Sequence, residues 1–223
     1  MQIRVLNEND IKKVMDMKAA IFATKDALKE YSNGKTDIPL RANLNVPEHN
    51  GQSLYMYGYV PGQDALGVKI VSVYPDNIAK NLTSVPATMV TLNSETGEVN
   101  SLIDGTYLTR LRTGAISGAA TDELANPDSK IFALFGTGGQ AETQLEAVLN
   151  VRDIKEVRVF DISKDRAKDF VNRMKEKLGS DFNFEINAAD SADQAIENAD
   201  IITTVTTAKE PVFDGTKVKK GCH

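Results

Sequence analysis

The stretch that decides the fold is Lys130-Ile131-Phe132-Ala133-Leu134-Phe135-Gly136-Thr137-Gly138-Gly139-Gln140-Ala141. Residues 131–135 form a continuous apolar run, as in a parallel strand that is buried on both faces. A glycine-rich segment follows at once, and residues 140–150 then show the apolar spacing of a helix. A strand, a glycine turn and a helix in this order predict the first βα unit of a doubly wound sheet.

The alternation of strand and helix patterns continues to the end of the sequence. This succession predicts a right-handed, mostly parallel sheet of the Rossmann type. Residues 125–129, Ala-Asn-Pro-Asp-Ser, precede it and read as a linker, so we expect an α/β domain over residues 128–223. The further elements expected in it are strands over 156–161, 182–187 and 200–205, and helices over 164–178 and 191–198.

The first half of the chain predicts a separate α+β domain over residues 1–127. Its elements are expected to be a helix or pair of helices over 8–30, strands over 53–59, 66–74, 87–92 and 99–103, and a hairpin loop over 93–97. A helix rich in small residues is expected from about 109 to 125, with Thr109 as its N-cap. So many glycines and alanines favour close packing against another element.

The glycine turn has the chemistry of a dinucleotide site. Gly136 permits a tight bend, Gly138 lets the backbone approach a pyrophosphate, and Ala141 keeps the helix close to the strand. The free N–H groups and the positive dipole end of the helix then favour that anion. We therefore expect Gly136, Thr137, Gly138, Gly139, Gln140 and Ala141 to bind the cofactor; the alternative is a turn that only packs.

Asp161 follows Ala141 by 20 positions, at the end of the next strand. A carboxylate there can accept hydrogen bonds from the adenosine ribose and would repel a 2'-phosphate, which favours NAD over NADP. Two readings remain open: Asp161 can simply cap the next helix, and nearby Lys164 and Arg166 can still tolerate a phosphate.

The last expected strand is followed, at the carboxyl end of the sheet, by Thr203, Thr204, Thr206 and Thr207. Cofactors lie at this end in doubly wound folds, so Thr206 and its neighbours are expected to contact the nicotinamide half. Ordinary loop threonines are the equal alternative.

Cations in the first half suggest an anionic substrate. Alternation places Lys69 on the same strand face as Val71. Burying an ammonium there is costly unless it meets an anion such as a carboxylate. The alternative is an edge strand from which the Lys69 side chain reaches solvent. Arg112 is expected in the first turn of the helix that begins at Thr109, where a bound anion would offset its conflict with the macrodipole. Arg110 shares this turn, and one of the two arginines can instead pair with Asp104.

Composition excludes several classes of function. A net charge of -5 without a Lys/Arg block gives no footprint for nucleic acid or anionic lipid. Cys222 is the only cysteine, and His49 and His223 are far apart, so neither a disulfide nor a Cys/His metal site is expected. We find no signal peptide or membrane-spanning run and expect a cytoplasmic protein.

Over essentially its whole length, the sequence resembles the ornithine cyclodeaminase and mu-crystallin family. Four segments carry the resemblance: Ile38-Pro39-Leu40-Arg41, residues 66–77 (LGVKIVSVYPDN), residues 108–115 (LTRLRTGA) and the turn Gly136–Ala141. The second and third segments, at this spacing ahead of a glycine turn, are specific. One departure is Tyr55-Met56-Tyr57-Gly58-Tyr59, where many members have a Met-Pro pair.

The resemblance implies a homodimer whose first domain supplies the dimer interface and the substrate site, while the Rossmann domain holds NAD(H). It implies that Arg41, Lys69 and Arg112 bind the carboxylate of an amino-acid or imino-acid substrate. It also makes Thr83 and Ser84 weaker candidates for contact with the nicotinamide.

The activity expected first is ornithine cyclodeamination, in which hydride transfer at Cα leads to proline and ammonia. Alanine dehydrogenase and cyclic ketimine (pyrroline-2-carboxylate) reductase are alternatives, as is a non-catalytic dinucleotide-binding protein like mu-crystallin. In cyclodeaminases a catalytic aspartate would follow the position of His223, so no catalytic residue is assigned here. The sequence stops where the family pattern would enter its next strand, so the Rossmann sheet is expected to be truncated.

Overall fold

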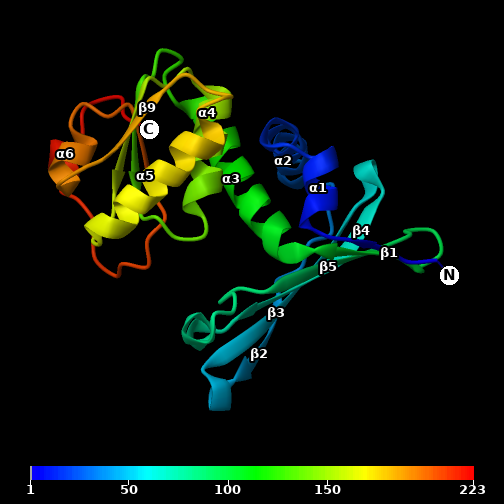
Figure 1. Cartoon of the computed structure of the whole chain (residues 1–223). Coiled ribbons are helices and arrows are strands. Elements are labelled where there is room, and N and C mark those ends of the chain that lie inside the picture. The colour runs from blue at the N-terminus through cyan, green and yellow to red at the C-terminus, as the bar shows by residue number, and fades with distance from the viewer. Residues whose placement is uncertain (1) are drawn as a thin grey trace. The chain divides into compact units, whose positions relative to one another are not determined.

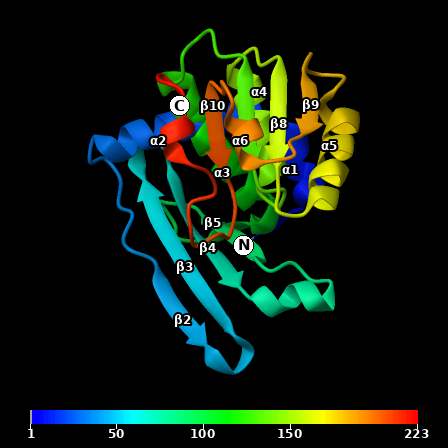
Figure 2. The same ribbon diagram turned by 90° about the vertical axis from the view of Figure 1, so that its left-hand side faces the viewer.

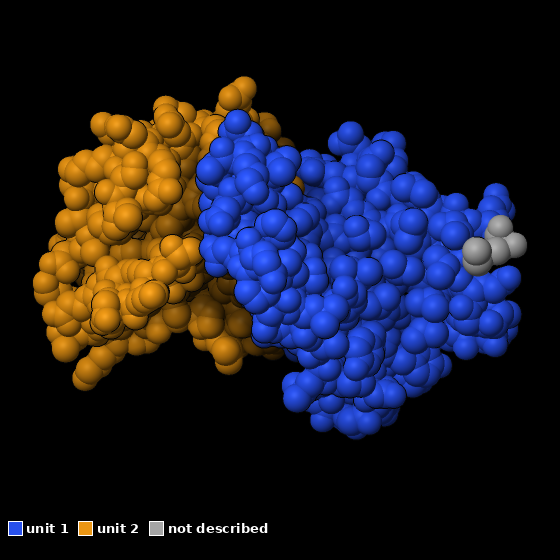
Figure 3. Space-filling view, turned by 90° about the horizontal axis from the view of Figure 1, so that it is seen from below, with its two compact units in different colours: residues 1–16, 23–109 blue, residues 17–22, 110–223 orange. Residues whose placement is uncertain are grey.

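A computed structural model describes residues 2–223, and they form two compact units. The first unit is Met1–Asp16 with Ala23–Thr109, and the second is Met17–Phe22 with Arg110–His223 (Figure 3). The division falls between Thr109 and Arg110, whereas the sequence placed the domain boundary near residue 127. The difference is a long helix, α3 (Gly105–Leu124), most of which packs with the second unit.

The second unit contains, within the described residues, a four-stranded parallel sheet in the order β10-β7-β8-β9 (Figure 2). The strand bounds are β7 (Ile131–Phe135), β8 (Glu156–Phe160), β9 (Glu185–Ala188) and β10 (Ile201–Thr204). Because the chain leaves β7 for β8 and later returns to the other side of β7 with β10, the strand order reverses at β7. Ligands bind at such a reversal in open α/β sheets, beyond the carboxyl ends of the strands.

Helices cover both faces of this sheet. Phe132 and Leu134 of β7 belong to a core that includes residues of α4 (Ala141–Val151) and α5 (Lys164–Leu178), whereas Ala133 and Phe135 pack with α6 (Ala192–Ile196). All four of these β7 side chains are fully buried. The prediction of a doubly wound Rossmann sheet is therefore confirmed, and its basis was an apolar run that must be buried on two sides.

Helix α3 begins earlier than the sequence indicated. The carboxylate of Asp104 accepts hydrogen bonds from the N–H groups of Thr106 (2.8 Å) and Tyr107 (3.0 Å), so it is Asp104 that caps this helix. Thr109 lies inside α3, and its prediction as the N-cap was wrong. Arg112 then lies about two turns into the helix, so the argument that placed it in the first turn against the macrodipole was also wrong.

The small residues of α3 permit close packing, as the sequence predicted. A Cβ atom on Gly114 would lie 2.5 Å from the carbonyl oxygen of Thr143, at the start of α4. A Cβ on Gly118 would lie 2.7 Å from a side-chain carbon of Ile21. These two glycines therefore allow backbones to approach at distances that any side chain would prevent.

The first unit contains, within residues 2–223, a six-stranded mixed sheet in the order β1-β6-β5-β4-β3-β2 (Figure 1). Its strands are β1 (Arg4–Leu6), β2 (Ala42–Val46), β3 (Gly51–Val60), β4 (Ala65–Val73), β5 (Ala87–Leu92) and β6 (Val99–Asp104); α1 (Glu8–Val14) and α2 (Met17–Ser32) form the expected pair of helices. The sequence missed the two outermost strands. β1 has three residues, and two asparagines weaken the strand propensity of β2.

The two faces of this sheet differ in exposure. One face carries Lys69 together with the buried side chains of Val71 and Ser101. The other face, here called the open face, is mainly apolar and largely uncovered in the single chain. Its apolar residues are Val5, Leu44, Tyr57, Val68, Ile70, Val90 and Leu102, and the polar Ser53, Ser72 and Thr88 lie on the same face.

In the part of the chain that the structure describes, no helix combines the length and the hydropathy that crossing a membrane requires.

Candidate functional site

The turn after β7 has the geometry that the sequence predicted. Gly136 has φ +93°, and its N–H donates to the carbonyl oxygen of Phe160 at 2.8 Å. A Cβ at this position would lie 2.8 Å from the carbonyl oxygen of Val205 and 3.1 Å from the methyl group of Thr206. Glycine is therefore required at Gly136 by the backbone angle and by the close approach of the segment after β10.

The next glycines leave open space in front of the turn. Apart from the glycine itself and its two chain neighbours, no described residue has a heavy atom within 4 Å of a Cβ placed on Gly138 or Gly139. α4 follows at Ala141, which is fully buried, and no side chain of the described residues caps the helix N-terminus. The N–H of Ala141 donates to the carbonyl oxygen of Gly138 at 3.0 Å, whereas Gly138 and Gly139 leave space in front of the turn for an anion such as a pyrophosphate to approach the remaining N–H groups.

Asp161 lies directly after β8 and is tied to the turn. Its side chain is 5% exposed and, among the described residues, accepts hydrogen bonds from four donors. Thr137 donates its N–H (3.1 Å) and its hydroxyl (2.7 Å) to Oδ2; the N–H of Ser163 (2.9 Å) and the guanidinium of Arg166 (2.8 Å) donate to Oδ1. Burial alone would raise the pKa of Asp161, but these hydrogen bonds and the charge of Arg166 outweigh it and lower the pKa. The group is therefore a carboxylate at neutral pH.

Both readings of Asp161 find some support in this geometry. The carboxylate lies beside the turn, where a ribose would lie, and it also fixes the start of α5 through the N–H of Ser163. The N-cap of α5 is Ser163 itself, whose hydroxyl accepts from the N–H of Arg166. The binding role of Asp161 remains a prediction.

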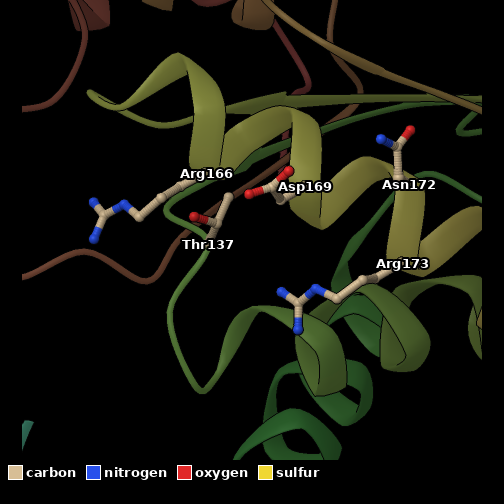
Figure 4. A pocket seen from close by; sticks show the side chains of 5 residues that line it. All are labelled: Thr137, Arg166, Asp169, Asn172 and Arg173. Atoms are coloured by element: carbon tan, nitrogen blue, oxygen red, sulfur yellow. The ribbon is translucent and has the colours of Figure 1, made fainter.

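A pocket lies beside the turn that sequence reasoning did not identify. Its volume is about 520 Å³, within the range of small-molecule sites, and Figure 4 shows the side chains that line it. The lining residues are Thr137 of the turn and Arg166, Asp169, Asn172 and Arg173 of α5. The spacing of Arg166, Asp169 and Arg173, at i, i+3 and i+7 of the expected helix, was the signal that could have revealed it.

Thr206 lies next to Gly136, as its contact with that glycine shows. Its hydroxyl accepts a hydrogen bond of 3.3 Å from the N–H of Ala208, and the side chain is exposed. The structure thus gathers Gly136, Asp161 and Thr206 at the carboxyl end of the parallel sheet. Contact of Thr206 with a nicotinamide remains a prediction.

Lys69 and Arg41 lie in the first unit. β4 is an inner strand of the sheet, so the alternative of an edge strand for Lys69 was wrong. Lys69 pairs with Met56 of β3, and continuing the β2–β3 register by one residue places Arg41 opposite the same Met56. Lys69 and Arg41 therefore lie in the same row across the sheet. Their strands are two strand spacings apart, or about 10 Å.

Arg112 belongs to the second unit. Burial of its guanidinium lowers the pKa of Arg112, and among the described residues it has no ion pair. The group still carries its charge at neutral pH, because an ordinary arginine titrates far above that range. The Arg112 side chain is nevertheless exposed, so its guanidinium is open to a bidentate pair with a carboxylate.

Ser84 and Thr83 precede β5 in the first unit. The carbonyl oxygen of Ser84 accepts the N–H of Tyr74 at 2.8 Å, and that of Thr83 accepts the amide of Asn77 at 2.9 Å. The other predicted cofactor residues belong to the second unit. A role for Ser84 at the cofactor therefore stays a prediction from the resemblance.

The profile of one protein family matches residues 1–223, that of the ornithine cyclodeaminase/mu-crystallin family. The chain belongs to the ornithine cyclodeaminase/mu-crystallin family. This confirms the resemblance found in the four sequence segments.

Among curated members of the ornithine cyclodeaminase/mu-crystallin family, a Δ(1)-pyrroline-2-carboxylate reductase from Bacillus cereus is 36% identical over 219 residues. These residues are 98% of this chain and 66% of that relative. The chain thus spans just under two thirds of the length of the curated relatives that it matches first.

Two solved structures of the family are similar. Thermococcus litoralis Δ(1)-pyrroline-2-carboxylate reductase, in complex with NADH and L-proline, is 43% identical with a TM-score of 0.91, covering 98% of this chain and 67% of that one. An archaeal alanine dehydrogenase dimer with bound NAD is 31% identical with a TM-score of 0.89, covering 100% and 66%. Both were solved with a nicotinamide cofactor present.

Proposed function

We propose that the protein reduces a cyclic imino acid, Δ(1)-pyrroline-2-carboxylate, to L-proline with NADH. The observation that carries this proposal is the glycine turn, open at Gly138 and Gly139, in a chain 43% identical to a reductase that holds NADH and L-proline. The sequence alone favoured ornithine cyclodeamination; the relatives support its alternative, the reductase, better.

The reaction balances as imino acid, NADH and one proton giving proline and NAD⁺. When bound, NADH supplies the hydride that the imine carbon accepts, while the ring nitrogen takes the proton. The chain's contribution is to bind and orient, since the hydride chemistry belongs to the cofactor. The turn Gly136–Ala141 would hold the pyrophosphate with its free backbone N–H groups, and Asp161 would accept hydrogen bonds from the adenosine ribose.

The cations hold the substrate by its carboxylate. We assign this role to Arg41, Lys69 and Arg112, of which Arg112 is an exposed cation without an ion pair in the described chain. A carboxylate bound by a guanidinium in a bidentate pair is fixed in direction as well as in position. The reacting carbon is attached to this carboxylate, so fixing one orients the other.

An NADH absorbance assay tests the proposed function. We expect the intact protein to oxidise NADH when it is given Δ(1)-pyrroline-2-carboxylate, and to form L-proline in equal amount. Alanine dehydrogenase activity is the second candidate because an alanine dehydrogenase is 31% identical; it would instead appear as NADH oxidation with pyruvate and ammonia. Formation of proline from L-ornithine without net change in NADH would support cyclodeamination instead. No turnover with the imino acid, with pyruvate and ammonia, or with L-ornithine would support a binding protein.

We also propose that the open face of the first unit is the interface of a homodimer. Val5, Leu44 and Tyr57 are 74%, 59% and 43% exposed on one sheet face, and Ile70, 36% exposed, lies on the inner strand β4. Exposed apolar side chains that gather on one sheet face mark an interaction surface. The alanine dehydrogenase with a TM-score of 0.89 is a dimer, which supports a second copy as the partner.

The variant Ile70→Asp is expected to shift the protein from dimer to monomer, because a carboxylate in the middle of an apolar interface would lose its water without gaining a partner. Light scattering after size-exclusion chromatography gives the mass. Val14→Asp is the matched control, since Val14 is 80% exposed on α1 and outside the sheet. A wild-type protein with the mass of one chain, or an unchanged dimer of a folded Ile70→Asp, would contradict the assignment.

A further inference from the structure

Helices α3 and α4 of the second unit contact each other through small residues. A Cβ on Gly114 would lie 2.5 Å from the carbonyl oxygen of Thr143, and a Cβ on Gly118 would lie 3.1 Å from the Cβ of Ala147. The contact advances by one helical turn on both helices, so they run side by side in the same direction over this stretch. The backbone of α3 therefore lies directly against α4 just after the glycine turn.

A hydrogen bond crosses from α4 to α3 at the start of this contact. Nε2 of Gln144 donates to the carbonyl oxygen of Thr113 at 3.3 Å, and Gln144 is only 4% exposed. A carbonyl oxygen has two lone pairs, so that of Thr113 can accept this bond together with one inside its own helix. Thr113 directly follows Arg112. Gln144 therefore holds α3 beside the cation that is assigned to the substrate carboxylate.

Stability alone does not account for a glutamine at this position. Oε1 of Gln144 is buried, and no described residue donates a hydrogen bond to it. An unpaired buried amide oxygen lowers the stability of a fold, whereas a methionine of similar length would fill the same space without this penalty. The neighbouring Leu145 and Val148 belong to the apolar core. The amide of Gln144 therefore meets a requirement other than core packing.

A different residue holds the end of α3. Arg152, which follows α4, donates from Nη2 to the carbonyl oxygens of Thr121 (3.0 Å), Asp122 (2.9 Å) and Ala125 (2.7 Å). Thr121 lies about 12 Å beyond Thr113 along the helix. The two helices are thus held together at this far end without Gln144, which fixes the part of α3 nearer the glycine turn.

The placement of α3 against α4 sets the geometry between the two parts of the proposed site that lie in the second unit. The start of α4 is assigned to the pyrophosphate, and α3 carries Arg112. Van der Waals contact between small residues has no preferred direction, whereas a hydrogen bond does. A misplacement of about 1 Å can lower a reaction rate by roughly a hundredfold, so a directional contact next to Arg112 affects the alignment of the substrate with the cofactor.

We propose that Gln144 is a positioning residue for the reduction. It holds α3 at Thr113 against α4, so that Arg112 fixes the substrate carboxylate at a constant distance from the cofactor bound at the turn. Gln144 touches neither the substrate nor the cofactor in this assignment. The inference rests on the proposed function, since it concerns the alignment of the imino acid with NADH.

The variant Gln144→Met removes the hydrogen bond and keeps the volume of the side chain. We expect kcat with Δ(1)-pyrroline-2-carboxylate, counted per NADH-binding site, to fall by tenfold or more, and the KM of the imino acid to change by less than threefold. The dissociation constant of NADH is expected to stay within threefold and the Tm within a few degrees of the wild type. Steady-state kinetics, calorimetry with NADH and thermal unfolding give these values.

Thr143→Val is the matched control for Gln144→Met. Thr143 is also buried on α4, but its hydroxyl donates to the carbonyl oxygen of Gln140 in the same helix, at 3.1 Å. This variant removes a buried hydrogen bond that does not reach α3. We therefore expect kcat within twofold of the wild type.

The variant Gln144→Glu tests the donor directly through its pH profile. A protonated carboxyl group can donate to the carbonyl oxygen of Thr113, whereas a carboxylate cannot, and burial raises the pKa of such a group. The ratio of its kcat to that of the wild type is expected to be high at low pH and to fall toward the ratio of Gln144→Met as the pH rises. The ratio for Gln144→Met should not change with pH.

The outcomes separate this inference from the proposed function. A wild-type kcat in folded Gln144→Met would overturn the inference alone, as would an equal loss in Thr143→Val or a kcat ratio of Gln144→Glu that does not depend on pH. A wild-type protein that does not reduce the imino acid would overturn the proposed function and, with it, this inference.

Discussion

Replacing Gly138 by valine is expected to abolish measurable NADH binding, a loss of at least a hundredfold, while the protein stays folded. Apart from the chain neighbours of Gly138, no described residue has a heavy atom within 4 Å of a Cβ placed there, so the apo fold tolerates the new side chain. The same space is the one that the pyrophosphate must enter, and valine would fill it. A hundredfold loss of affinity corresponds to about 2.7 kcal/mol of binding free energy. Calorimetry measures this loss, and thermal unfolding shows whether the variant is as stable as the wild type.

Gly215→Val is the control for this variant. Apart from its chain neighbours, no described residue has a heavy atom within 4 Å of a Cβ on Gly215 either, and this residue lies in a short 3₁₀ helix (Gly215–Lys217) rather than in the turn. We expect Gly215→Val to bind NADH like the wild type and both variants to unfold within a few degrees of it. Unchanged NADH affinity in a folded Gly138→Val would show that the cofactor binds elsewhere.

Replacing Arg112 by methionine should lower kcat/KM for the imino acid by roughly 30- to 1000-fold, or about 2–4 kcal/mol, the range for removing one partner of a desolvated charge pair. The dissociation constant of NADH is expected to stay within threefold, because Arg112 is assigned to the substrate carboxylate and not to the cofactor. Steady-state kinetics and a separate NADH titration distinguish the two effects.

Arg112→Lys tests the same assignment with the charge retained. It is expected to recover part of the lost activity, since lysine keeps the attraction but cannot form the bidentate pair. An equal loss of NADH affinity and activity in Arg112→Met, or wild-type kinetics, would contradict the role of Arg112.

The sequence predicted the Rossmann half of the fold well because its signals are local. A strand that is buried on two faces must be apolar throughout, as residues 131–135 are, and a turn with φ +93° that touches another backbone must be glycine, as Gly136 is. The two outermost strands of the first sheet lacked such signals. β2 contains two asparagines, which weaken its strand propensity, and it pairs on one side only, with the adjacent strand β3.

The start of α3 shows how a plausible local signal can mislead. Thr109 and Asp104 are both good N-cap residues, and the sequence alone does not say which one the backbone uses. The choice depends on where β6 ends, at Asp104, which is set by its pairing with β5. Moving the N-cap from Thr109 to Asp104 places Arg112 about one and a half turns further into the helix than expected. This removed the dipole argument but left the charge argument in place.

The candidate site was predictable in part. The turn, Asp161 and Thr206 follow from their positions at the carboxyl ends of successive strands, and the structure places them together. The pocket beside them was not foreseen, because it depends on which face of α5 points toward the turn. Nor does the sequence reveal that Asp161 is already engaged by Thr137, Ser163 and Arg166.

The central claim is that the backbone after β7 binds the pyrophosphate of a nicotinamide dinucleotide, and titration of the intact protein with NADH in a calorimeter tests it most directly. The account predicts saturable binding of one NADH per chain, with a dissociation constant in the range of roughly 1 µM to 1 mM that is common for enzyme ligands. Absence of heat and of saturation up to millimolar NADH, in a protein shown to be folded, would contradict it.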